Sequence, residues 1–164
     1  MHPQEERAEK LRRLRRLMAE HGLDAIWLRR LSSFAWLTAG AADYVGIADE
    51  HGIASLLVTD EHVYLYTSNI EAPRLEREEG LLAAGFTWRV SHWYRPADPL
   101  ASREPARIGC DEAFPGLANL GPHVSALRAR LLPPEAERMA DLGRRCAEAM
   151  TAAIGVVRPG MAEL

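Results

Sequence analysis

Two short apolar runs in the middle of the chain, separated by three polar residues, predict a β-hairpin. The first run covers residues 53–59 (IASLLVT) and the second covers residues 63–67 (VYLYT), with Asp60, Glu61 and His62 between them. Runs of this length that are rich in β-branched and aromatic residues and end at polar turns are typical of β-strands. The hairpin therefore predicts one antiparallel pair of strands within the fold.

Further strand-like runs alternate with helical patterns on both sides of the hairpin. Predicted strands cover residues 24–28 (DAIWL), 86–93 (FTWRVSHW) and 106–111 (ARIGCD). Helical patterns cover residues 5–21 and 124–132, with shorter ones between the strands. Strands interspersed with helices, together with one hairpin, predict an α/β domain with a mixed β-sheet flanked by helices.

Two of the predicted helices carry sequence signals at their ends. Ser32 or Ser33 is expected to cap a brief helix that Gly40 ends. In residues 69–79 we expect Asn69 as the N-cap, with an ion pair between Arg74 and Glu78 at i+4 spacing.

A double proline, Pro133-Pro134, precedes the longest helical pattern, residues 135–157. Its apolar residues spread round more than one face, so we expect this linker helix to expose an apolar stripe that recruits a partner. We divide the chain into an α/β domain, residues 1–132, and a linker with the first helix of a further domain, residues 133–164. The last four residues look like the start of another element, which leaves open whether the natural chain continues past Leu164.

Charge and composition argue against several classes of partner. The formal net charge of −3 is too small to favour nucleic acid or an anionic membrane. No run approaches the roughly 20 apolar residues of a membrane span, and the N-terminal MHPQEERAEK lacks the apolar stretch of a secretory signal. Cys110 and Cys146 fall in no metal or redox motif, so we expect two reduced thiols in a cytoplasmic protein.

The sequence contains no motif that points to catalysis or metal binding. No HxH, HExxH, glycine-rich phosphate loop or GxSxG pattern occurs. His51 follows Asp43 and Asp49, but three polar residues in an irregular stretch indicate a surface loop rather than a metal site. We therefore predict that this chain has no catalytic residue and no metal site of its own.

Three stretches, in this order, resemble the creatinase/prolidase/aminopeptidase P family. Residues 21–40 (HGLDAIWLRRLSSFAWLTAG) look like the start of its N-terminal domain, and residues 52–79 (GIASLLVTDEHVYLYTSNIEAPRLEREE) are similar to the hairpin and helix of Xaa-Pro aminopeptidases. Residues 135–164 resemble the family linker and its I-x-P-G-x-[ST]-E signature, although Ala162 stands where the family has Ser or Thr.

The resemblance implies a non-catalytic N-terminal domain of a metal-dependent Xaa-Pro peptidase, either an aminopeptidase or a dipeptidase. The family's second, "pita-bread" domain binds two divalent metal ions (Mn, Co or Zn) through two Asp, one His and two Glu, which would all lie beyond Leu164. The implied partners are this catalytic domain and a second copy of the chain, with neither nucleic acid nor membrane, and the implied role is to form dimers and limit active-site access. The alternative is a stand-alone binding or dimerisation module without peptidase activity.

Within the chain, we expect the loop 41–51 and the segment 69–74 (NIEAPR) to face that active site. The candidate substrate-facing residues are Tyr44, Asn69, Glu71 and Arg74. Each also has a local role as an alternative, which is helix capping, ion pairing or ring packing.

Overall fold

The computed structural model describes residues 2–46, 48–101 and 105–162. Contacts within the chain divide it into two compact units, His2–Arg130 and a second unit that begins at Leu131. Among the described residues, no helix combines the length and the apolar character needed to cross a membrane.

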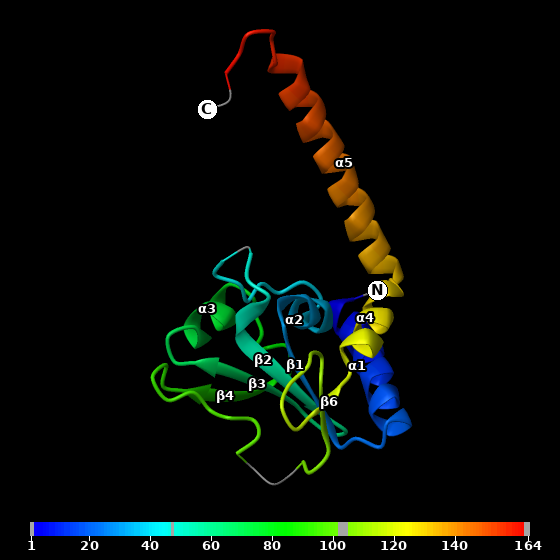
Figure 1. Ribbon diagram of the computed structural model, residues 1–164, viewed down its shortest axis with the longest axis vertical. Helices are drawn as coiled ribbons and strands as arrows, with labels where there is room; N and C mark the ends of the chain where they lie inside the picture. The colour runs from blue at the N-terminus through cyan, green and yellow to red at the C-terminus, as the bar shows by residue number, and fades with distance from the viewer. Residues whose placement is uncertain (1, 47, 102–104, 163–164) are drawn as a thin grey trace. The chain divides into compact units, whose positions relative to one another are not determined.

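A six-stranded sheet with the order β4-β3-β2-β1-β5-β6 forms the centre of the first unit (Figure 1). The strands are β1 (Ala25–Arg30), β2 (His51–Thr59), β3 (Val63–Ser68), β4 (Thr87–Ser91), β5 (Ile108–Cys110) and β6 (Ala118–Asn119). β2 is antiparallel to both β1 and β3, whereas β1 pairs with β5, β3 with β4, and β5 with β6 in parallel. The predicted mixed sheet is confirmed, and so is the hairpin, which is β2–β3 with Val58 opposite Val63.

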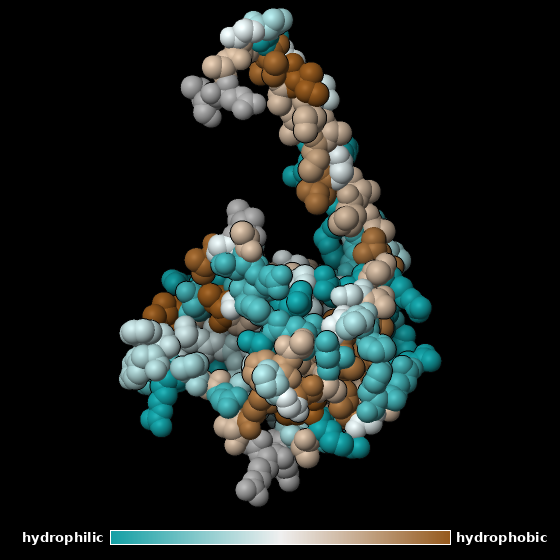
Figure 2. Space-filling model, viewed as in Figure 1, coloured by the Kyte–Doolittle hydropathy of each residue, from teal (hydrophilic) through white to brown (hydrophobic). Residues whose placement is uncertain are grey.

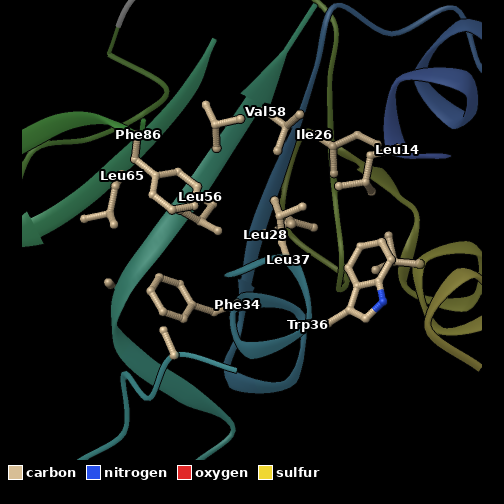
Figure 3. Close-up of a cluster of buried hydrophobic side chains, with 14 of the residues drawn as sticks. Leu14, Ile26, Leu28, Phe34, Trp36, Leu37, Leu56, Val58, Leu65 and Phe86 are labelled. Carbon is tan, nitrogen blue, oxygen red and sulfur yellow. The ribbon is translucent and has the colours of Figure 1, made fainter. Parts of the chain in front are cut away.

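Four helices pack on the sheet and share one hydrophobic core. They are α1 (Pro3–Glu20), α2 (Leu31–Thr38), α3 (Ala72–Arg77) and α4 (Gly121–Ala129). Figure 3 shows Leu14 of α1 and Phe34 and Trp36 of α2 against Ile26 and Leu56 of the sheet. Because strand side chains alternate between faces, the neighbouring residues Trp27 and Leu57 fall in a second, smaller cluster on the opposite face. Irregular-segment residues Leu100, Phe114 and Leu117 pack there.

The start of α2 differs from the prediction that a serine caps it. The helix begins at Leu31, before both serines, and its N-cap Arg30 has no capping side chain. Instead, the buried carboxylate of Asp111 accepts hydrogen bonds from the backbone N–H groups of Arg29 (2.9 Å) and Arg30 (3.2 Å). A carboxylate that follows β5 thus holds the last two residues of β1, directly before the helix.

Helix α1 carries both exposed and buried ion pairs. Arg16 and Glu20 form an exposed pair at 2.9 Å, as expected for a solvated outer face. Lys10, the only lysine of the chain, is instead 1% exposed. Its ammonium donates to Glu6 at 2.5 Å and to the carbonyl oxygen of Trp36 at 2.6 Å. The backbone oxygen lies near the carboxyl end of α2, where a positive charge is favoured.

Helix α5 (Pro133–Val156) belongs to the second unit. It begins at Pro133, two residues before the predicted start, because proline is well accommodated in the first turn of a helix. Apolar residues are visible along it in Figure 2. Met139, Leu142, Met150 and Ile154 are each more than half exposed, which confirms the expected apolar exposure.

Candidate functional site

One edge of the sheet gathers the polar residues that the sequence analysis singled out. The parallel strands β1, β3, β4 and β5 all end at this edge, and the antiparallel strand β2 begins there. In open α/β sheets, ligands bind outside the carboxyl ends of the strands. This carboxyl edge is therefore the candidate functional site of the chain.

The four predicted substrate-facing residues all lie in segments next to this edge. Tyr44, in the loop before β2, is half exposed. Arg74 of α3 donates from Nη1 to the carbonyl oxygen of Ala42 at 3.2 Å, so it ties α3 to the same loop. Asn69 and Glu71 lie between β3 and α3. Whether these four side chains face a substrate stays a prediction.

Two local roles predicted for these residues are wrong. Asn69 is not a helix cap, because α3 starts only at Ala72 and the Asn69 side chain accepts a hydrogen bond from Trp93 N at 2.9 Å. Arg74 does not pair with Glu78. Its guanidinium lies 3.4 Å from Glu71 and 3.9 Å from Glu79 instead.

The carboxyl group of Asp43, in the loop before β2, is buried, and the residue is only 1% exposed. Its carbonyl oxygen accepts from Ile53 N at 2.9 Å, and its side chain lies directly against Gly52. Burial raises the pKa of Asp43 from its ordinary value of 3.8 to about 7, although the positive charge of Arg74 opposes this shift and Glu79 adds to it. The only sequence signal for the contact between Asp43 and the hairpin is a glycine, Gly52, near the start of the first hairpin strand.

The raised pKa of Asp43 predicts that the contribution of this group to stability falls as the pH rises. A carboxyl group with a higher pKa in the folded state than in the unfolded state favours folding fully below about pH 4, and this contribution is lost as the pH approaches 7. We expect Asp43→Asn to remove this decline. The free energy of unfolding of the variant, relative to that of the wild type, should therefore rise by at least about 1 kcal/mol from pH 4 to pH 7. Urea unfolding across this range measures the difference. As a control, Asp49→Asn changes an exposed aspartate of the same loop, and its free energy of unfolding should decline with pH as in the wild type. If the free energies of unfolding of the wild type and of Asp43→Asn change with pH in parallel, the prediction is contradicted.

His51 belongs to an ion cluster rather than to the loop carboxylates. Its Nε2 lies 2.9 and 2.8 Å from the two carboxylate oxygens of Glu112. Glu112 also accepts from Arg29 Nη1 at 2.5 Å and lies 3.9 Å from Arg30 Nε. Within the described ranges, no three His, Cys, Asp or Glu side chains are grouped so that they could hold a metal ion.

Comparisons with known proteins agree on the type of domain. The family model of the creatinase/prolidase N-terminal domain matches residues 10–139. The crystal structure of the prolidase from Pyrococcus horikoshii is similar over 94% of this chain, with a TM-score of 0.64 and 15% sequence identity. The similarity covers 45% of the prolidase chain, so this chain spans less than half of the length of that enzyme. No curated protein matches the sequence.

Proposed function

Because the chain belongs to the family of creatinase/prolidase N-terminal domains, we propose that it is the non-catalytic N-terminal domain of a metal-dependent Xaa-Pro peptidase. The observation that carries this proposal is the family match over residues 10–139, joined to the fold shared with a prolidase. In this proposal the parent protein is a hydrolase, an aminopeptidase or a dipeptidase, and it acts in the cytoplasm.

The proposed domain boundary lies at the double proline, with residues 1–132 forming the α/β domain and residues 133–164 leading into a catalytic domain. The exposed apolar residues of α5 support this arrangement, because such surfaces are usually covered by a partner. We expect the partner to be the catalytic domain encoded after Leu164, which would supply the ligands for two divalent metal ions (Mn, Co or Zn).

We propose that the carboxyl edge of the sheet limits access to that active site. The hydrogen bond of Arg74 with the carbonyl oxygen of Ala42 joins α3 to the loop before β2, which supports this proposal. Tyr44, Asn69, Glu71 and Arg74 are the side chains proposed to face the substrate. The proposed homodimer rests on the resemblance to the family alone.

The chain of 164 residues is expected to lack peptidase activity by itself. Water activation by two metal ions needs a cluster of carboxylate and imidazole ligands, and the part of the chain that the structure describes contains no such group. The purified chain with Mn²⁺, Co²⁺ or Zn²⁺ should therefore hydrolyse Ala-Pro and Ala-Pro-Ala no faster than the metal salt alone. Metal-dependent turnover that persists after repeated purification would overturn the proposal.

The coding sequence after Leu164 separates the proposal from a stand-alone module. An open reading frame that encodes the two Asp, one His and two Glu in family order supports an N-terminal domain. A stop codon directly after Leu164 would instead favour a binding or dimerisation module without peptidase activity.

A further inference from the structure

A hollow of about 250 Å³ opens at the carboxyl edge, and Trp27 and Arg29 of β1, Tyr66 of β3 and Trp93 after β4 are among the residues that line it. Trp27, Arg29 and Tyr66 alternate with the core-facing residues Ile26, Leu28 and Leu65, so they project from the face opposite the four helices. All of these residues lie within the unit His2–Arg130. From this hollow we propose a binding site for a small carboxylate with a compact apolar body, about the size of one amino acid.

The aromatic side chains supply apolar walls, of which that of Trp27 is fixed in position. Trp27 Nε1 donates to Ser55 Oγ at 3.0 Å, and the Trp27 ring contacts Phe114 edge-on at 5.3 Å. Trp93 is 63% exposed, so its ring remains available to a ligand at the rim. Flat, rigid aromatic surfaces bind apolar groups at low cost in conformational entropy.

Arg29 supplies a positively charged group that is already oriented. Its guanidinium carbon lies 4.8 Å from the ring centre of Trp27 and 4.7 Å from that of Phe114. Within the described residues, Nη1 is the only atom of the Arg29 side chain that donates a hydrogen bond, and the acceptor is Glu112. The carboxylate of Glu112 also lies close to Arg30 and His51. The remaining N–H groups of a guanidinium held in this way match the geometry of a carboxylate.

The hydroxyl groups of the hollow also favour an acceptor-rich ligand. Ser55 Oγ accepts from Trp27, Ser68 Oγ from Glu71 N at 3.3 Å, and Ser91 Oγ from Ala97 N at 3.0 Å. Each serine oxygen therefore accepts one hydrogen bond, and across the described ranges none of these hydroxyls donates to the protein, so each O–H remains available to a ligand. Burial raises the pKa of Tyr66, so its phenol keeps its proton and is a further donor.

The volume limits the ligand to a small molecule. At about 250 Å³ the hollow is smaller than the roughly 300–1,000 Å³ of sites for drug-sized ligands, so it favours a small ligand. The hydrogen-bond donors of the hollow match a carboxylate, and its aromatic walls match an apolar group. The hollow therefore favours a carboxylate that carries an apolar group over a fully polar anion.

Titration of the 164-residue chain with 4-methylpentanoate, followed by calorimetry and by tryptophan fluorescence, tests this site. We expect saturable binding that weakens about tenfold or more in Arg29→Gln, because hydrogen bonds to a charged group are lost, and that also weakens in Trp93→Ala. Trp93→Ala changes an exposed side chain, so it tests the site even if Arg29→Gln is poorly folded. Arg16→Gln, on an exposed residue of α1, which packs on the other face of the sheet, should bind like the wild type.

Two further ligands distinguish the alternatives. 4-Methylpentanamide has the same shape without the charge, and equal binding of the amide would overturn carboxylate recognition. Inorganic phosphate has the charge without the apolar body, and equal or tighter binding of phosphate would overturn the proposed ligand class. The absence of saturable binding of 4-methylpentanoate up to its solubility limit would also overturn the proposal.

Discussion

Replacement of Lys10 by methionine is expected to lower the free energy of unfolding by about 3–5 kcal/mol, the usual cost of removing one partner of a buried ion pair. The Lys10 ammonium is 1% exposed and contacts both Glu6 and the Trp36 carbonyl oxygen. Methionine fills a similar volume, so the loss comes mainly from leaving the charge of Glu6 and a helix-end carbonyl without the ammonium donor. Urea denaturation of the wild type and the variant measures this difference.

An exposed ion pair on the same helix provides a matched control. Arg16 and Glu20 have the same i,i+4 spacing, but their side chains are 74% and 55% exposed. Arg16→Met should therefore cost less than about 1 kcal/mol. The double variant Glu6→Leu/Lys10→Met should recover much of the loss, because it removes both charges together. If Lys10→Met lowers the free energy of unfolding no more than Arg16→Met does, the buried pair of Lys10 with Glu6 does not stabilise the fold more than an exposed pair.

Local periodicity predicted the elements of this fold that depend on neighbours in sequence. The hairpin and α5 are such elements, because alternation and helical spacing act over a few residues. The signals that failed depend on distant partners. Lys10 bonds to a carbonyl 26 residues away, and Asp111 bonds to the backbone N–H of Arg30, 81 residues before it. A single sequence gives no information about which of its many charged residues meet across such distances.

The candidate site shows the same division between local and distant information. Tyr44 and Arg74 belong to the two segments that are expected to face the active site. Both segments lie at the carboxyl edge of the sheet. The predicted pair of Arg74 with Glu78 does not form, although the Glu78 N–H donates to the Arg74 carbonyl oxygen at 2.8 Å as in a helix. The Arg74 guanidinium instead donates to the carbonyl oxygen of Ala42, which is 32 residues away in sequence. The ion cluster around Glu112 had no sequence signal, since three strand ends that are distant in sequence bring it together.

Replacement of Gly52 by alanine is expected to destabilise the chain by about 1–3 kcal/mol, the typical cost of overpacking a tight contact. An added Cβ atom at this position would lie 2.7 Å from the backbone oxygen of Asp43 and closer still to its carboxyl group. A side chain can rotate away, but the backbone oxygen also accepts the hydrogen bond from Ile53 N, so the loop itself would have to move. Thermal and urea unfolding report the loss of stability.

Two comparisons separate the effect of this contact from the general effect of alanine. Gly143→Ala lies in α5 with no atom within 4 Å of the added carbon, and alanine in a helix is favoured by about 0.5–1 kcal/mol over glycine. This variant should therefore be neutral or more stable. In a background of Asp43→Ala, the carboxyl group is absent but the backbone oxygen remains, so Gly52→Ala should still cost part of its original penalty. If the penalty vanishes there, the side chain alone sets the spacing, and the loop before β2 is free to move relative to the strand. The same loop contributes Tyr44 to the proposed substrate-facing edge, so the answer also decides whether that edge has one fixed shape.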